Sequence, residues 1–91
     1  MIKQRNRLYG ESIELLTEGI RIFPGSEPLH ICLAISYMNL AKFDDALSIL
    51  MKFQDSPDAL QQIAACHRAL GQPAKEQFFL DRLKALAKHL Q

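Results

Sequence analysis

Few residues of this 91-residue chain have the types and spacing that metal binding requires. Glu27 and His30 show the Glu-x-x-His spacing of helical di-iron sites, but such a site needs a second pair and further glutamates from neighbouring helices. Two histidines and two cysteines, in the pairs His30 with Cys32 and Cys66 with His67, match the ligands of a zinc site in number. On a helix, however, side chains one or two residues apart diverge by about 100° or 200°. We therefore expect no metal site and no cofactor.

The same geometry argues against catalysis by a cysteine nucleophile. Cys66 and His67 are adjacent, so a helix turns them apart, and no polar third residue is placed to orient the histidine. The sequence also has no glycine-rich phosphate loop and no serine-nucleophile motif. We predict that the protein is not an enzyme and has no catalytic residues. Cys32 and Cys66 lie among apolar neighbours and are expected to be free thiols in the core.

Charge and hydropathy make nucleic acid and membranes improbable partners. The net charge of +1 gives no general attraction to either. Lys3, Arg5 and Arg7 alternate with polar residues only, as in an ordinary solvated terminus. The first residues lack the apolar segment of a secretion signal, and no apolar run approaches the ~18 residues of a membrane span. These features predict a cytoplasmic protein.

Prolines, a glycine and capping residues divide the chain into about five helices within a single domain, residues 1–91. Ser26 is the expected N-cap of the second helix, and Pro28 lies in its first turn. Asp55-Ser56-Pro57 supplies the cap and the first residue of the fourth helix, which Gly71 ends. The expected helices are residues 8–23, 27–41, 44–54, 57–70 and 73–90. Short connections make consecutive helices antiparallel neighbours.

Two internal echoes indicate a repeat. At an offset of 34 residues, Tyr9, Ser12, Ile13, Leu15 and Leu16 correspond to Phe43, Ala46, Leu47, Ile49 and Leu50. At an offset of 30 residues, Leu33, Ala34, Leu40, Leu50 and Phe53 correspond to Ile63, Ala64, Leu70, Leu80 and Leu83. A period of about 34 residues is typical of tetratricopeptide (TPR) helix pairs. We predict an all-α, TPR-like stack of antiparallel helical hairpins, with repeats at residues 27–56 and 57–90 after a lone helix B at residues 8–23.

This register leaves the first helix without its own helix A, because residues 1–8 are too few to form one. In a stack each helix hides its apolar face on its neighbours, so the face of the first helix should be incompletely covered. That face consists of Ile13, Leu16, Ile20 and Phe23. Either the other four helices cover it, or a second protein or a second copy of the chain does.

The inner face of the stack is the expected binding surface. If Leu33, Ala34 and Tyr37 are packing positions, other side chains of the second helix turn toward a groove, namely Ile31, Ile35, Met38 and Asn39. The fourth helix would add Gln61, Ala65, Arg68 and Ala69. A mainly apolar trough with a polar rim is typical of helix-in-groove recognition. The alternative is that Ile35 and Met38 pack against the last helix.

Three segments carry a family resemblance: residues 37–47 (YMNLAKFDDAL), 64–71 (AACHRALG) and 80–83 (LDRL). With them, roughly residues 30–85 resemble TPR-type chaperones of bacterial type III secretion, especially the YscG-like chaperones of the needle subunit. Small TPR proteins of plant-pathogen secretion clusters share the Ala-x-Cys-x-x-x-Leu-Gly pattern of residues 64–71. The chain departs from the family in lacking a full N-terminal hairpin and in its longer loop near residues 55–57.

The resemblance implies a bacterial, cytoplasmic chaperone that keeps a self-polymerising needle subunit monomeric. It would clasp the amphipathic C-terminal helix of that subunit, usually with a small helical co-chaperone on the outside. Self-association through the N-terminal helix is a further expectation for the uncovered face. The competing interpretation is a generic TPR scaffold that joins two folded proteins. A chaperone groove should be apolar, whereas an adaptor often clamps a charged peptide end with several Lys or Arg residues, of which only Arg68 is expected on this surface.

Overall fold

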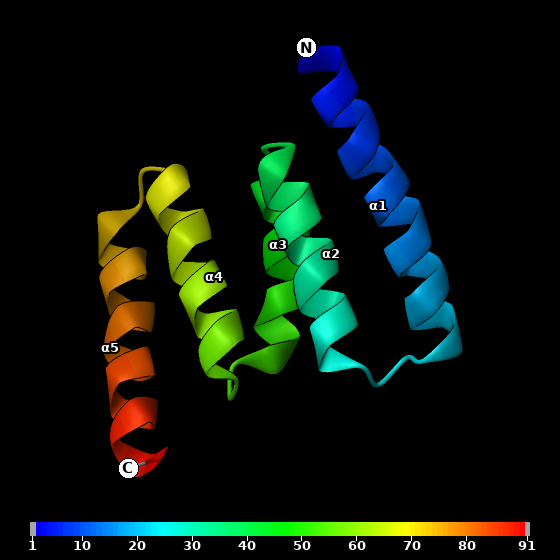
Figure 1. Cartoon of the computed structure of the whole chain (residues 1–91). Helices are drawn as coiled ribbons and strands as arrows, with labels where there is room; N and C mark the ends of the chain where they lie inside the picture. Colours follow the sequence, from blue (N-terminus) through cyan, green and yellow to red (C-terminus); the bar gives the residue numbers. More distant parts are fainter. Residues whose placement is uncertain (1, 91) are drawn as a thin grey trace.

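Five α-helices form a row in the computed structural model, which describes residues 2–90 and the side chains of residues 8–88. They are α1 (Ile2–Ile22), α2 (Glu27–Asn39), α3 (Phe43–Leu50), α4 (Pro57–Ala69) and α5 (Pro73–Leu90), and the 3₁₀ turn η1 (Met51–Phe53) follows α3. Each helix packs against the next, and α2 also packs against α4 (Figure 1). The described residues contain no strand, so the all-α stack of helical hairpins expected from the repeats is confirmed.

Matching N-caps begin the two helices at the start of the predicted repeats. The side-chain oxygen of Ser26 accepts a hydrogen bond from the backbone N–H of Leu29, at 3.4 Å. Ser56 accepts one from the N–H of Ala59, also at 3.4 Å. In both helices a proline occupies the first turn. Backbone N–H groups there have no partner within the helix, so the N–H that proline lacks is not needed. The predicted starts of α2 and α4 are therefore confirmed.

Matching C-caps end the same two helices. The residue after each C-cap has a left-handed backbone, with φ of 61° at Ala41 and 71° at Gly71. The next residue in each case donates its N–H to the carbonyl five residues earlier, which is the Schellman arrangement. These bonds run from Lys42 to Tyr37 and from Gln72 to His67, each 2.9 Å long. The cap at Gly71 was expected, whereas an alanine in this conformation was not.

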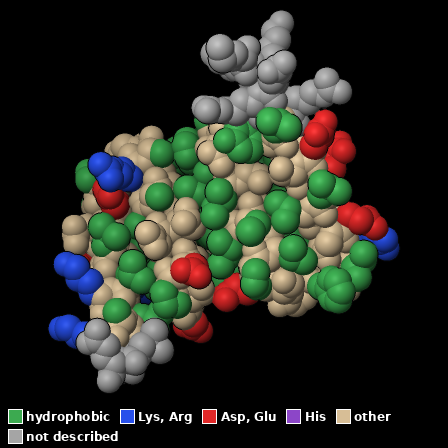
Figure 2. Space-filling view, in the orientation of Figure 1, with side chains coloured by type: hydrophobic (Ala, Val, Ile, Leu, Met, Phe, Trp, Pro, Cys, Tyr) green, Lys and Arg blue, Asp and Glu red, His purple; other side chains and the backbone are tan. Residues whose placement is uncertain are grey.

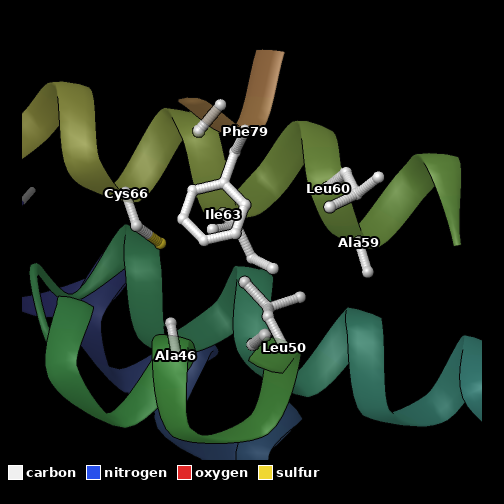
Figure 3. Packing of buried hydrophobic residues seen from close by; sticks show 9 residues of the cluster. Ala46, Leu50, Ala59, Leu60, Ile63, Cys66 and Phe79 are labelled. Atoms are coloured by element: carbon white, nitrogen blue, oxygen red, sulfur yellow. The ribbon is translucent and has the colours of Figure 1, made fainter. Parts of the chain in front are cut away.

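The core lies between α2, α3, α4 and α5. Its buried residues are Ala34, Ala46, Leu50, Ala59, Leu60, Ile63, Ala64, Cys66 and Phe79. Four of them are alanines, whose small side chains let the helix backbones approach closely. Figure 3 shows Leu50 of α3 directed toward Ile63 of α4, with Phe79 of α5 alongside. Among the described side chains, α1 contributes none to this cluster.

Two predicted helix ranges were wrong. The first helix was expected to begin at residue 8, but residues 2–7 continue α1 upward past the end of α2 (Figure 1). The third helix was expected to run to residue 54, but α3 ends at Leu50 and the chain tightens into η1. A tighter turn suits this position, because Pro57 forces the preceding Ser56 into an extended backbone and the chain must reverse within a few residues.

Candidate functional site

The candidate binding surface lies on α2 and α4, the two helices that correspond to helix A of each repeat. We call it the inner surface. It consists of Ile31, Cys32, Ile35, Met38 and Asn39 of α2, with Gln61, Ala65 and Arg68 of α4. Contact between α2 and α4 brings the two rows together. Residues 30 positions apart hold equivalent positions in the two repeats, for example Ile35 and Ala65, or Met38 and Arg68.

The apolar residues of α2 differ in how much of them the core covers. Ile31 and Met38 are half-buried and pack against the core cluster, so they only partly turn toward solvent. Ile35 is half-buried but is not among the side chains that pack on that cluster. The cluster on which Met38 packs includes Phe79 of α5. Ile35 is therefore the apolar centre of the inner surface.

Polar and small residues surround this centre. Asn39 is exposed, and its side-chain Nδ2 donates to the backbone oxygen of Ile35 at 3.0 Å. On α4, Gln61 and Arg68 are exposed and Ala65 is half-buried. Figure 2 shows hydrophobic side chains spread over the middle of this view, in which α2 lies in front of α3, with charged side chains at the left and right margins and acidic ones also below the middle. An apolar centre with a charged edge can bind one face of an amphipathic helix.

Cys32 belongs to the inner surface, contrary to the prediction that both cysteines lie in the core. Cys66 is fully buried, but Cys32 is exposed. The apolar neighbours of Cys32 in sequence suggested burial, yet the helical period places it with Ile35 and Asn39 on the face turned away from the core. Cys32 lies three residues before Ile35, and Asn39 lies four residues after it. This helical spacing, rather than the apolar residues adjacent to Cys32, predicts its exposed position.

The face of α1 that was expected to be uncovered divides into two parts. Ile13, Leu16 and Ile20 are half-buried against α2, while Phe23, just past the helix, is 64% exposed. The most exposed apolar side chains of the helix itself lie on another stripe, formed by Leu8, Leu15 and Ile22. Sequence reasoning missed this stripe, although its spacing of seven residues was a readable signal.

His30 and His67, the histidines whose side chains the structure describes, have separate polar partners. The Nδ1 atom of His30 is 2.7 Å from the backbone oxygen of Ser26, and that of His67 is 2.8 Å from Oε1 of Gln72. Burial raises the pKa of the Cys66 thiol to about 11, so at neutral pH it stays protonated and unreactive. Within the described part of the chain, no three His, Cys, Asp or Glu residues are grouped so that they could hold a metal ion.

An open pocket of about 220 Å³ lies at a different place, where η1 meets α4 and α5. Its lining residues are Gln54, Asp55, Leu60, Arg82, Ala85 and Leu86. Arg82 donates from Nη1 to Oε1 of Gln54 at 2.9 Å, which ties α5 to the end of η1. None of the predicted groove residues lines this pocket.

Comparisons with protein-family models, with curated proteins and with solved structures gave no match for this chain. Among the helices that the structure describes, none is both long enough and apolar enough to cross a membrane. The inner surface and the exposed side of α1 are therefore the features from which a function has to be inferred.

Proposed function

We propose that this protein is a protein-binding chaperone that holds an amphipathic helix of a self-assembling subunit against the inner surface. The observation that carries the proposal is that Cys32 is exposed and Ile35 half-buried in the α2 part of the inner surface. Ala65, the equivalent of Ile35 on α4, is small, so a ligand helix can approach α4 closely. The apolar side of such a ligand would gain about 25 cal/mol for each Å² removed from water.

The resemblance to YscG-like chaperones supports a particular client, the needle subunit of a bacterial type III secretion system. Such a subunit forms filaments through an apolar helix, so a cytoplasmic chaperone can keep it monomeric only by masking that helix. The apolar centre and polar rim of the inner surface suit this task. A small helical co-chaperone is a further partner that the same resemblance suggests.

A generic scaffold that joins two proteins is the second candidate, and the exposed Arg68 favours it. A guanidinium on this surface can pair with a carboxylate of a peptide end. The two functions differ in which residue dominates binding. A scaffold that clamps a charged peptide depends on Arg68, whereas a chaperone groove depends on Ile35.

The test is to measure binding of a labelled peptide from the C-terminal helix of a type III secretion needle subunit. Ile35→Asp places a charge where an apolar helix must dock, and burying an unpaired charge is costly. We expect binding to weaken by about 3 kcal/mol, roughly a hundredfold. Fluorescence anisotropy gives the dissociation constants, and circular dichroism checks that the variant keeps its helices.

Lys52→Ala is the control, because Lys52 is exposed on η1 and lies outside the inner surface. It should leave the dissociation constant unchanged. Folded Ile35→Asp protein that binds the peptide as tightly as the wild type contradicts the proposal. Loss of binding in Arg68→Ala with retention in Ile35→Asp would favour the scaffold.

A further inference from the structure

Helix α4 has a single exposed strip, and this strip forms the α4 part of the inner surface. The helix packs against α2, η1, α3 and α5, and its buried residues are Ala59, Leu60, Ile63, Ala64, Cys66 and His67. Its exposed residues are Pro57, Asp58, Gln61, Arg68 and Ala69. At 3.6 residues per turn, all the exposed residues fall within about 80° of Ala65 around the helix axis. We call this row the α4 strip.

The two charged residues of the α4 strip have opposite signs and lie at its two ends. Asp58 is in the first turn of α4 and Arg68 is in the last. They are ten residues apart, which corresponds to about 15 Å along the helix axis. Within the described part of the chain, neither side chain takes part in a hydrogen bond or an ion pair. Both charges are therefore available to a ligand, one at an acidic end and one at a basic end of the strip.

The charges beside α2 follow the same order. Figure 1 shows α2 and α4 running in the same direction, so both helices begin at the acidic end. The half-buried Glu27 begins α2, and the exposed Lys42 follows its C-cap. Asp44 and Asp45 come next in the sequence, but they belong to α3, which lies behind α2 in Figure 1. Figure 2 shows acidic side chains below the middle of the view, near the start of α4.

We propose that the inner surface selects its client helix by charge and holds it antiparallel to α4, an inference that rests on the function proposed above. The apolar stripe of the client lies on Ile35, while one of its acids pairs with Arg68 and one of its bases pairs with Asp58. The rise of a helix separates this acid and this base by about ten or eleven residues. The occupant is thus an amphipathic helix of at least three turns with an acid near one end and a base near the other.

The direction of the client follows from the helix macrodipole. Acids stabilise a helix near its N-terminus, and bases stabilise it near its C-terminus. An antiparallel client satisfies this rule, because its N-terminal end lies at Arg68 and its C-terminal end at Asp58. In a parallel client the base would lie at the N-terminus and the acid at the C-terminus, where each opposes the dipole. The same rule also suits Asp58 and Arg68 to α4 itself, so binding rather than stability tests the proposal.

Two labelled helical peptides of the same composition and the same apolar stripe are the probes. The acid-first peptide has a glutamate in its first turn and a lysine eleven residues later, and the base-first peptide has these two residues exchanged. We expect the wild-type chain to bind the acid-first peptide about tenfold more tightly at low salt, since two exposed ion pairs replace two like-charge contacts. Added salt should reduce this difference. Fluorescence anisotropy gives the dissociation constants.

Variants of the α4 strip separate this preference from any difference in helicity between the peptides. Asp58→Asn combined with Arg68→Gln removes both charges and should retain only the preference that the peptides themselves cause. Asp58→Lys combined with Arg68→Glu exchanges the charges at constant net charge and should shift the preference toward the base-first peptide. Lys52→Glu changes the net charge as Arg68→Glu does, but on η1 outside the strip, and should keep the wild-type preference.

Circular dichroism and urea unfolding show which variants fold, and the neutral double variant decides if the exchanged one does not. An equal preference in the wild type and the folded neutral variant overturns the inference. It leaves the proposed function standing if Ile35→Asp still weakens binding of both peptides. A wild-type preference for the base-first peptide overturns the antiparallel direction. A wild-type chain that binds neither peptide overturns the inference and the proposed function together.

Discussion

At the scale of single residues, the clearest contrast lies between the two left-handed positions that end α2 and α4. Both close the same hydrogen-bonded cap, but one is Gly71 and the other Ala41. A left-handed backbone costs an L-residue roughly 1–2 kcal/mol, and glycine avoids this cost. Glycine also gives the unfolded chain more freedom, which offsets part of the gain.

We therefore expect Ala41→Gly to stabilise the protein by about 0.5–1 kcal/mol and Gly71→Ala to destabilise it by about 1 kcal/mol. No side chain blocks a methyl group at Gly71, so only its backbone conformation opposes the alanine. Urea unfolding of both variants gives the two free energies. A loss of stability in Ala41→Gly would show that the cap of α2 is not left-handed in solution.

The second residue-scale prediction concerns the buried thiol of Cys66, whose pKa is raised by burial from an ordinary 9.0 to about 11. Between these values the unfolded thiol loses its proton while the folded one keeps it, so the unfolded state binds fewer protons and stability falls as pH rises. Below pH 9 the contribution of the buried, protonated thiol to the stability of the protein is fully present. The stability difference between wild type and Cys66→Ala should shrink from pH 7 to pH 10, as measured by urea unfolding. A constant difference would contradict the burial of this thiol.

At the scale of elements, α1 packs chiefly against one neighbour, α2. Its contact with α2 passes through Gly19, where an added Cβ would lie 3.3 Å from Cδ1 of Leu29. Gly10, two turns earlier, has nothing within 4 Å of the same position. Substitutions at the two glycines therefore test the packing of α1 at two positions along its length.

Alanine replaces glycine favourably in an open helix, so Gly10→Ala should stabilise the protein by about 0.5–1 kcal/mol. Gly19→Ala should raise the free energy of unfolding clearly less, because Leu29 must move by a few tenths of an ångström to admit the methyl group. Thermal unfolding of the pair under identical conditions gives the comparison. Equal gains would mean that α1 does not contact α2 at Leu29.

The elements also show which parts of the fold the sequence could predict. The ends of α2 and α4 could be placed because Ser26, Ser56 and Gly71 have side chains or backbones suited to caps. The left-handed Ala41 could not be predicted, since alanine has no preference for that conformation. The early start of α1 was missed because residues 2–7 show neither an apolar period nor an N-cap.

The candidate binding surface was predictable only in outline. Helical periodicity placed Ile35 and Asn39 on one face. In the structure the exposed Cys32 lies on the same face. Periodicity could not tell that Ile31 and Met38 also reach the core, because their burial comes from neighbouring helices that are distant in sequence. The exposure of the α1 stripe depends in the same way on packing between helices, because among the described helices α1 packs chiefly against α2.

At the scale of the whole molecule, the core is shared by α2 to α5, and the proposed binding functions use what lies outside it. The inner surface is proposed for a client helix.

The central claim is that a client helix docks on the inner surface. Isoleucine side chains occur both there and on α1, so NMR of chains labelled at the isoleucine δ1 methyl groups reports on both places in one titration. With the C-terminal helix peptide of the needle subunit, we predict that the signals of Ile31 and Ile35 move while those of Ile13 and Ile22 stay in place. Movement of the α1 signals with Ile35 unchanged would contradict the claim.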